Sequence, residues 1–168
     1  INSDSLDYGY LYYCENKTDT INIENVTNLP LTYNSVQITG LNADNFTILE
    51  KPNDGEILVR GNPVKFVIEF KPLTPYGNKS AILEINTSEK TLNCPLKGEY
   101  AEIDISVNDI DMGIRNLNVL YDTVLTIRNN TRDNFTLNNI IIGDNRVTLA
   151  TALPMEIPSM QEIEIDLE

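Results

Sequence analysis

The chain has 168 residues, of which 41% are apolar, a composition typical of a globular protein with a true core. Its 25 acidic and 12 basic residues give a formal net charge of −13, which would repel both nucleic-acid phosphates and an anionic membrane surface. No apolar run approaches the roughly 18 to 20 residues of a membrane-spanning helix. We therefore expect neither nucleic-acid binding nor membrane insertion of this segment.

The first hundred residues consist of short alternating segments separated by turn residues, a pattern typical of half-buried β-strands. The clearest is Val64–Phe70, in which apolar residues alternate with Lys65 and Glu69. Pro72 should end this strand, because proline cannot donate to a sheet ladder. Further candidate strands lie at 20–24, 29–33, 36–38, 46–48, 82–85 and 92–96. The total of about seven or eight strands is what a two-sheet sandwich needs.

The later part of the chain repeats the earlier part at an offset of 104 residues. The matched segments are Asp7-Tyr8-Gly9 with Asp111-Met112-Gly113, Ile21–Asn25 with Leu125–Asn129, and Thr27 with Thr131. After short deletions Ile48 falls on Leu149, and Phe66, Ile68 and Phe70 fall on Ile163, Ile165 and Leu167. We therefore expect a complete module at residues 1–100 and a second, C-terminally incomplete repeat at 101–168, with an open strand edge.

These landmarks together resemble the abnormal-spindle and hydin (ASH) type of immunoglobulin-like domain. The resemblance rests on Asp7-Tyr8-Gly9, the strand ending at Asn25, Leu29–Thr32, Asn45–Ile48, Phe70-Lys71-Pro72, Ala81–Ile85 and Leu96-Lys97-Gly98. It implies an antiparallel β-sandwich related to the major sperm protein fold, with no cofactor and no catalytic residues. Cys14 departs from the family pattern. The expected fold class is all-β, with tandem immunoglobulin-like antiparallel β-sandwiches, the second truncated.

The residue types argue against an enzyme. The sequence contains no histidine, which removes Ser-His-Asp and Cys-His catalysis as well as imidazole metal ligands. Acidic side chains cluster at 104–111, and Asp4 lies near Asp7, but such clusters more often solvate a strand edge than form a catalytic pair. Carboxylates in residues 99–104 could bind calcium, but the sequence there has no spaced calcium-loop motif, so we prefer a solvated linker. We expect no catalytic residues, no metal and no cofactor.

Two groups of residues are candidates for a special role. Four tyrosines lie between residues 8 and 13, and strand alternation points two of them outward. We expect these to be Tyr10 and Tyr12, an aromatic face for a sugar or protein on an edge strand open to β-augmentation. Cys14 and Cys94 lie near opposite ends of the first module. The sequence does not settle whether they form a disulfide, because this depends on the distance and orientation of the two residues in the fold.

The function that fits these features is a non-catalytic structural spacer or protein-interaction module of a larger secreted or surface-displayed bacterial protein. Its partners would be other domains of the same polypeptide or another protein, including a strand that associates with the open edge of the second repeat. Low pI, few lysines and a short inter-module linker favour an extracellular, cell-surface or periplasmic location. Two alternatives stay open: a cytoplasmic scaffold of cytoskeletal or ciliary type, and a carbohydrate-binding accessory domain.

Overall fold

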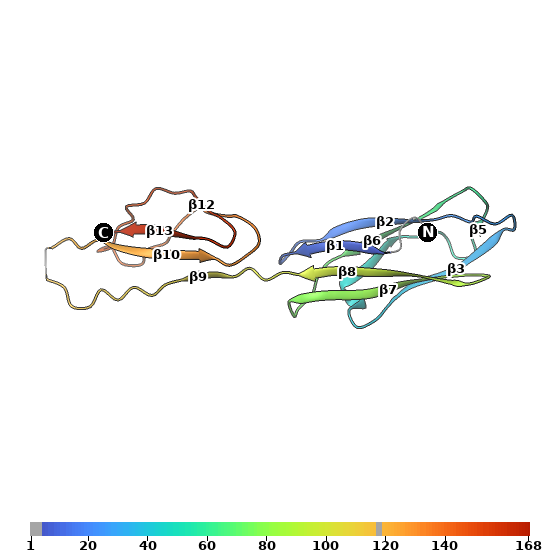
Figure 1. Ribbon diagram of the computed structural model, residues 1–168, viewed down its shortest axis with the longest axis horizontal. Coiled ribbons are helices and arrows are strands. Elements are labelled where there is room, and N and C mark those ends of the chain that lie inside the picture. Colours follow the sequence, from blue (N-terminus) through green and yellow to red (C-terminus); the bar gives the residue numbers. More distant parts are fainter. Residues whose placement is uncertain (1–4, 117–118) are drawn as a thin grey trace. The chain divides into compact units, whose positions relative to one another are not determined.

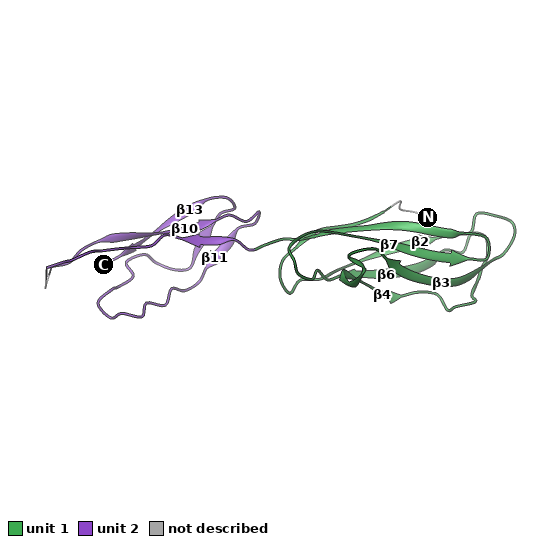
Figure 2. Ribbon diagram, turned by 90° about the horizontal axis from the view of Figure 1, so that it is seen from below, with its two compact units in different colours: residues 1–102 green, residues 103–168 purple. Residues whose placement is uncertain are grey.

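The computed structural model describes residues 5–116 and 119–168. The chain divides into two compact units, Ile1–Glu102 and Ile103–Glu168, called unit 1 and unit 2 below (Figure 2). Over the described residues the regular elements are β-strands, apart from a single 3-10 turn, η1 (Ala43–Asn45). The predicted all-β class is confirmed. No helix in these ranges has the length and apolar character of a membrane span.

Unit 1 contains two sheets, whose strands are labelled in Figure 1. The five-stranded sheet has the order β1 (Leu6–Leu11), β8 (Thr91–Tyr100), β7 (Gly77–Thr87), β3 (Leu31–Thr39) and β5 (Ile57–Leu58). The three-stranded sheet has the order β2 (Lys17–Ile23), β6 (Val64–Phe70) and β4 (Phe46–Glu50). Strand β1 runs parallel to β8, and the other pairs are antiparallel. The predicted strand at Val64–Phe70 is confirmed with those bounds.

The core of unit 1 lies between its two sheets. Phe66, Ile68 and Phe70 of β6 have no exposed surface, and they belong to one buried cluster with Leu83, Ile85 and Leu96 of the other sheet. Burying each such side chain stabilises the fold by roughly 1.5 to 3 kcal/mol. The Tyr8 hydroxyl also donates to the Ile68 carbonyl at 3.0 Å, joining the sheets. Unit 1 is therefore a β-sandwich.

Strand β3 unites two segments that the sequence pattern separates. The register shifts between Tyr33 and Ser35, which marks a bulge in the pairing with β7. Because a bulge adds one residue, it moves the inward positions from odd numbers (Leu31, Tyr33) to even numbers (Val36, Ile38). The sequence pattern thus looks like two short strands because the inward-facing positions shift by one residue within a single strand.

Unit 2 also contains two sheets but fewer strands. One has the order β13 (Glu162–Leu167), β10 (Thr123–Asn129) and β9 (Ile105–Val107), and the other pairs β11 (Phe135–Leu137) with β12 (Met155–Ile157). Ile127, Ile157 and Ile165 form its buried centre, with partly buried side chains around them. Both sheets contribute to this core, which is much smaller than that of unit 1.

Strand registers in the two units can be compared directly. Ile23 pairs with Val64 as Ile127 pairs with Ile163, and Leu31 pairs with Leu58 as Phe135 pairs with Ile157. By these pairs the counterpart of Phe66 is Ile165, so the predicted match of Phe66 to Ile163 is wrong by two residues. A slip of two residues keeps every side chain on its own face, so apolar alternation alone could not detect it.

Candidate functional site

The tyrosines near β1 do not form the predicted outward face. Tyr10 is 37% exposed, but Tyr12 is only 9% exposed, so the expectation that both point outward is wrong for Tyr12. Gly9 adopts a positive φ of 70°, and the pairing with β8 shifts register between Asp7 and Tyr10. The extra residue reverses the alternation, so Tyr10 is exposed although Tyr8 is buried. Tyr12 follows the end of β1, and its ring packs edge-on against Tyr10 at 5.8 Å.

The two cysteines are separate thiols in the structure. Cys94 is buried in β8, whereas Cys14 is exposed in the turn that follows β1. Because Leu11 lies opposite Tyr100, Cys14 lies beyond that end of the pair, while Cys94 is back along β8 by roughly 20 Å at the usual rise per residue. A disulfide needs Cα atoms within about 7 Å of each other. The pairing that the sequence left open is therefore not formed. Cys14 instead hydrogen-bonds Tyr13, and this raises the pKa of that phenol.

A buried asparagine joins three segments of unit 1. The Asn25 side-chain amide donates to the carbonyls of Leu29 and Leu58, each at 2.8 Å. Its carbonyl oxygen accepts from the Thr27 backbone N–H at 2.9 Å and from the Thr27 hydroxyl at 2.8 Å. All the polar atoms of this buried amide are therefore paired, as a stable core requires. The network fixes the turn between β2 and β3 and attaches β5 to it.

The same network recurs in unit 2, 104 residues later. The Asn129 amide donates to the carbonyls of Asp133 at 2.7 Å and Ile157 at 3.1 Å. Its oxygen accepts from the backbone N–H of Thr131 at 2.9 Å and from the Thr131 hydroxyl. The repeated asparagine and threonine of the sequence therefore hold the same turn in each unit, and their role is structural.

The acidic residues considered as catalytic candidates have turn-forming contacts. The Asp7 carboxylate accepts from the Gly9 N–H at 2.9 Å, and the Asp111 carboxylate accepts from the Gly113 N–H at 2.8 Å. Both glycines have a positive φ. Asp4 lies outside the described residues. Within residues 5–116 and 119–168, no group of three His, Cys, Asp or Glu side chains is arranged to hold a metal ion.

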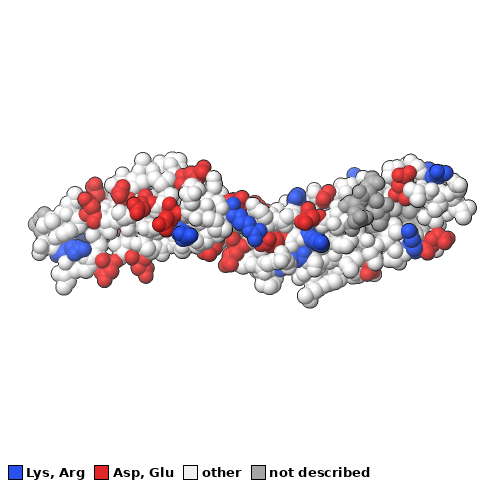
Figure 3. All heavy atoms as spheres, viewed as in Figure 1, with Lys and Arg blue, Asp and Glu red and all other residues white. Residues whose placement is uncertain are grey.

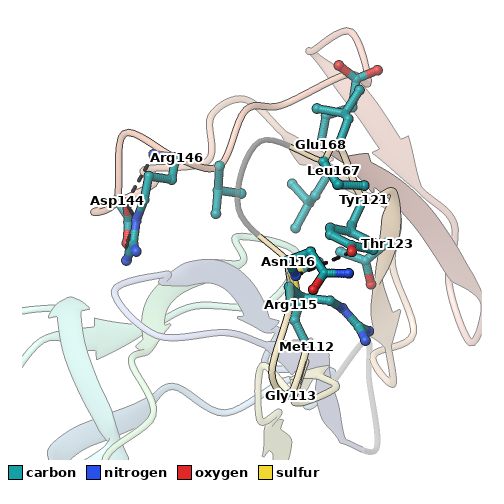
Figure 4. A pocket seen from close by; sticks show the side chains of 13 residues that line it. Met112, Gly113, Arg115, Asn116, Tyr121, Thr123, Asp144, Arg146, Leu167 and Glu168 are labelled. Carbon is teal, nitrogen blue, oxygen red and sulfur yellow. Dashed lines mark hydrogen bonds and ion pairs between the residues drawn. The ribbon is translucent and has the colours of Figure 1, made fainter.

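Unit 2 contains a cavity with a volume of about 660 Å³ (Figure 4). Met112, Val147 and Leu167 give it an apolar wall. At one side, the Arg146 Nε donates to the Asp144 carboxylate at 3.0 Å, and this pair lowers the pKa of Asp144 to about 2. Arg115 and Glu168 also line the cavity, and the Arg115 guanidinium lies 5.1 Å from the centre of the Tyr121 ring, so the lining is both apolar and charged.

Unit 1 fills the corresponding volume with an aromatic cluster. The rings of Tyr8, Phe46 and Phe70 lie 4.9 to 5.9 Å apart between centroids. Met112 has the place of Tyr8, and Val147 has the place of Phe46, since Leu149 bridges Leu167 as Ile48 pairs with Ile68. Smaller side chains at the places of Tyr8 and Phe46 therefore leave this volume open, and the repeat in the sequence already contains that difference.

Charge does not mark a site on the surface drawn in Figure 3. Acidic and basic side chains are interspersed over that face, and neither sign gathers into one broad patch. On the exposed face of β3 and β7, Gln37 and Thr39 donate to the Glu84 carboxylate at 2.7 and 2.9 Å, and the Asn86 amide donates to the Ser35 hydroxyl at 3.1 Å. The bonds from Gln37 and Thr39 lower the pKa of Glu84.

The chain matches no family model and no curated protein sequence. Among solved structures it is similar to the VesB protease of Vibrio cholerae (TM-score 0.42, 12% identity, 58% of this chain). It is also similar to the secreted serine protease VesC of that organism (0.46, 14%, 96%) and to the CupB2 chaperone of Pseudomonas aeruginosa (0.43, 10%, 98%). The chain spans 30% of the VesB chain, 42% of the VesC chain and 86% of the CupB2 chain. At these TM-scores the likenesses assign neither a fold family nor an activity.

Proposed function

We propose that the chain is a pair of tandem immunoglobulin-like β-sandwich modules of the ASH type that serves as a non-catalytic structural spacer. The observation that carries the proposal is the anchor network of Asn25 and Thr27, repeated with the same partners at Asn129 and Thr131. The matching strand registers also support a tandem pair of related modules. A chain that repeats its architecture without repeating any reactive group is suited to setting distances between other domains.

The connection between the units supports a spacer. Ala101 N–H donates to the Leu11 carbonyl at 2.9 Å, and Asn130 N–H donates to the Asp104 carbonyl at 2.9 Å. Only Glu102 and Ile103 lie between these two anchored residues. A linker of this length leaves few backbone torsions free, and short linkers transmit orientation better than long flexible ones.

The remaining parts of the proposal rest on composition. The lack of histidine supports a non-catalytic role, and the net charge of −13 with few lysines supports a segment of a secreted or surface-displayed bacterial protein. In that setting the modules would hold a neighbouring domain of the same polypeptide at a fixed separation.

Distance measurement by pulsed electron paramagnetic resonance tests the spacer role. Thr47→Cys in β4 and Thr136→Cys in β11 place one spin label on an exposed strand position of each unit, in a Cys14→Ser background. Cys94 is 1% exposed and should remain unlabelled. We expect a narrow distance distribution, because the two-residue connection limits the relative motion of the units.

The matched control inserts ten Gly and Ser residues between Glu102 and Ile103, which should broaden the distribution markedly. If the uninterrupted chain already gives a distribution as broad as that of the insertion variant, the spacer proposal is overturned.

A further inference from the structure

We propose that a pocket of unit 1 binds a small organic carboxylate, with the ammonium group of Lys79 as its cation. The pocket has a volume of about 440 Å³ and is formed by residues 41–45, between β3 and β4, and by residues 73–79, which lead into β7. This volume falls in the range of small-molecule sites. The proposal gives unit 1 a ligand, which the spacer role does not, and it does not depend on that role.

Lys79 carries a positive charge that the fold buries without a counter-ion. It lies on the inward side of β7, two residues before Ala81, and is only 4% exposed. Its ammonium group donates to the Pro75 carbonyl, and in the described part of the chain no carboxylate lies within 4.0 Å of it. One neutral acceptor leaves two N–H donors and the charge itself without a partner there. Because buried charges are normally paired, an anion in the pocket would supply the interaction that the fold lacks.

The neighbouring amide groups of the pocket are oriented as hydrogen-bond donors. The Asn42 side chain accepts from the Ser80 N–H at 3.1 Å through its oxygen, which leaves its amide nitrogen without a partner among the described residues. The Asn45 amide nitrogen donates to the Asn42 carbonyl at 3.2 Å and retains a second N–H. Asp44 is the one acid among the described residues that line the pocket. Because an ionised carboxylate only accepts hydrogen bonds, it fits this set of donors.

The fold holds the pocket in shape and gives it an apolar wall. The Asn45 side-chain oxygen accepts from the Leu73 N–H at 2.7 Å, which joins the two segments that form the pocket. The Tyr76 ring packs against the Tyr100 ring, with 4.6 Å between their centroids. Leu41, Leu73 and Tyr76 line the pocket and are exposed. An apolar body attached to the carboxylate would therefore contact a preformed surface.

Binding of 3-phenylpropionate to the intact 168-residue chain tests the proposal. The backbone amide resonances of Asn78 and Lys79 report on the pocket in NMR titrations. The comparison compounds are 3-phenylpropanamide, which has the same body without the charge, and acetate, which has the charge without the body. We expect each of them to bind at least about fivefold more weakly than 3-phenylpropionate. Equal binding of either compound, or 3-phenylpropionate leaving both resonances unmoved at millimolar concentration, would overturn the proposal.

Charge substitutions inside and outside the pocket locate the binding site. Asn42→Asp keeps the oxygen that accepts from Ser80 but replaces the amide donor with a negative charge, and we expect about tenfold weaker binding. Asp44→Asn should tighten binding about threefold, because it removes the acid of the pocket. The matched control, Asn62→Asp, makes the same change of charge at an exposed turn residue outside the lining, and it should change the affinity by less than about twofold. Equal weakening by Asn42→Asp and Asn62→Asp would show that net charge sets the affinity, and the pocket would not be the site.

Lys79→Met tests the cation directly. Methionine keeps most of the buried apolar stem but removes the ammonium group, so 3-phenylpropionate should bind no more tightly than its amide. NMR resonances outside the pocket show whether this variant folds, and if it does not, Asn42→Asp and its control decide the question. A folded Lys79→Met variant that still prefers the carboxylate would overturn the proposal. The spin-label distances do not depend on this pocket, so failure here leaves the spacer proposal to its own test.

Discussion

Units 1 and 2 share their polar anchors but differ in how far their cores are closed. In both, the side chain of a buried asparagine fixes the turn before the next strand, with four hydrogen bonds at Asn25 and five at Asn129. Unit 1 surrounds that anchor with two sheets and a large buried cluster, whereas the buried cluster in the described part of unit 2 consists of Ile127, Ile157 and Ile165. The comparison shows that the anchor is a local device, which forms without the strands that complete the core.

The largest expected effect comes from removing the anchors themselves. Asn25→Ala leaves the carbonyls of Leu29 and Leu58 without their donor, and we expect it to destabilise unit 1 by about 3 kcal/mol. Asn129→Ala removes the same bonds from unit 2, whose smaller core leaves less stability in reserve. We expect unit 2 to unfold. Hydrogen exchange measured by mass spectrometry resolves the two units separately.

Matched substitutions control for the loss of an amide as such. Asn28→Ala and Asn138→Ala change exposed asparagines of unit 1 and unit 2, and they should shift stability by less than about 0.5 kcal/mol. Equal effects at Asn129 and Asn138 would show that the anchor of unit 2 contributes nothing.

Gly98→Ala tests the close packing of β8 against the Phe70 ring in unit 1. A methyl group at Gly98 would come within 2.6 Å of the Phe70 Cζ atom, and the Phe70 ring is fully buried. We expect a loss of about 2 kcal/mol from overpacking, seen as an earlier urea midpoint in tyrosine fluorescence. That signal reports mainly on unit 1, because Tyr121 is the one tyrosine of unit 2.

Gly143→Ala is the control for this change, since nothing lies within 4 Å of a methyl group there. It should be nearly neutral. Adding Phe70→Leu to Gly98→Ala should recover part of the loss, since the smaller side chain makes room. An additive double variant would place the cause elsewhere than in the contact with Phe70.

How much of this the sequence could predict depends on the range of the interaction. Strand β6 was predictable because alternation and Pro72 act locally, and the repeat was visible because Asn25 and Asn129 stand in matching turns. The burial of Tyr12 was not, because Tyr12 lies past the end of β1 at Leu11, where strand alternation no longer sets the direction of a side chain. The cavity of unit 2 was missed because it depends on side-chain volumes brought together from Met112, Val147 and Leu167.

The smallest expected effect concerns one residue that differs between the units at a strained position. Met160 has a φ of 58° and Gly61 a φ of 76°, and both lie three residues before the strand pair that aligns Ile163 with Val64. Left-handed backbone costs a non-glycine residue about 1 to 2 kcal/mol, while glycine loses about 0.5 to 1 kcal/mol of extra chain entropy on folding. Met160→Gly should therefore stabilise unit 2 by about 0.5 kcal/mol, and Gly61→Met should destabilise unit 1 by a similar amount. A methyl group at Gly61 meets nothing within 4 Å, so strain and not a clash sets the sign. Urea unfolding followed by hydrogen exchange in each unit checks both variants, and shifts of the same sign in the two would mean that the positions are not equivalent.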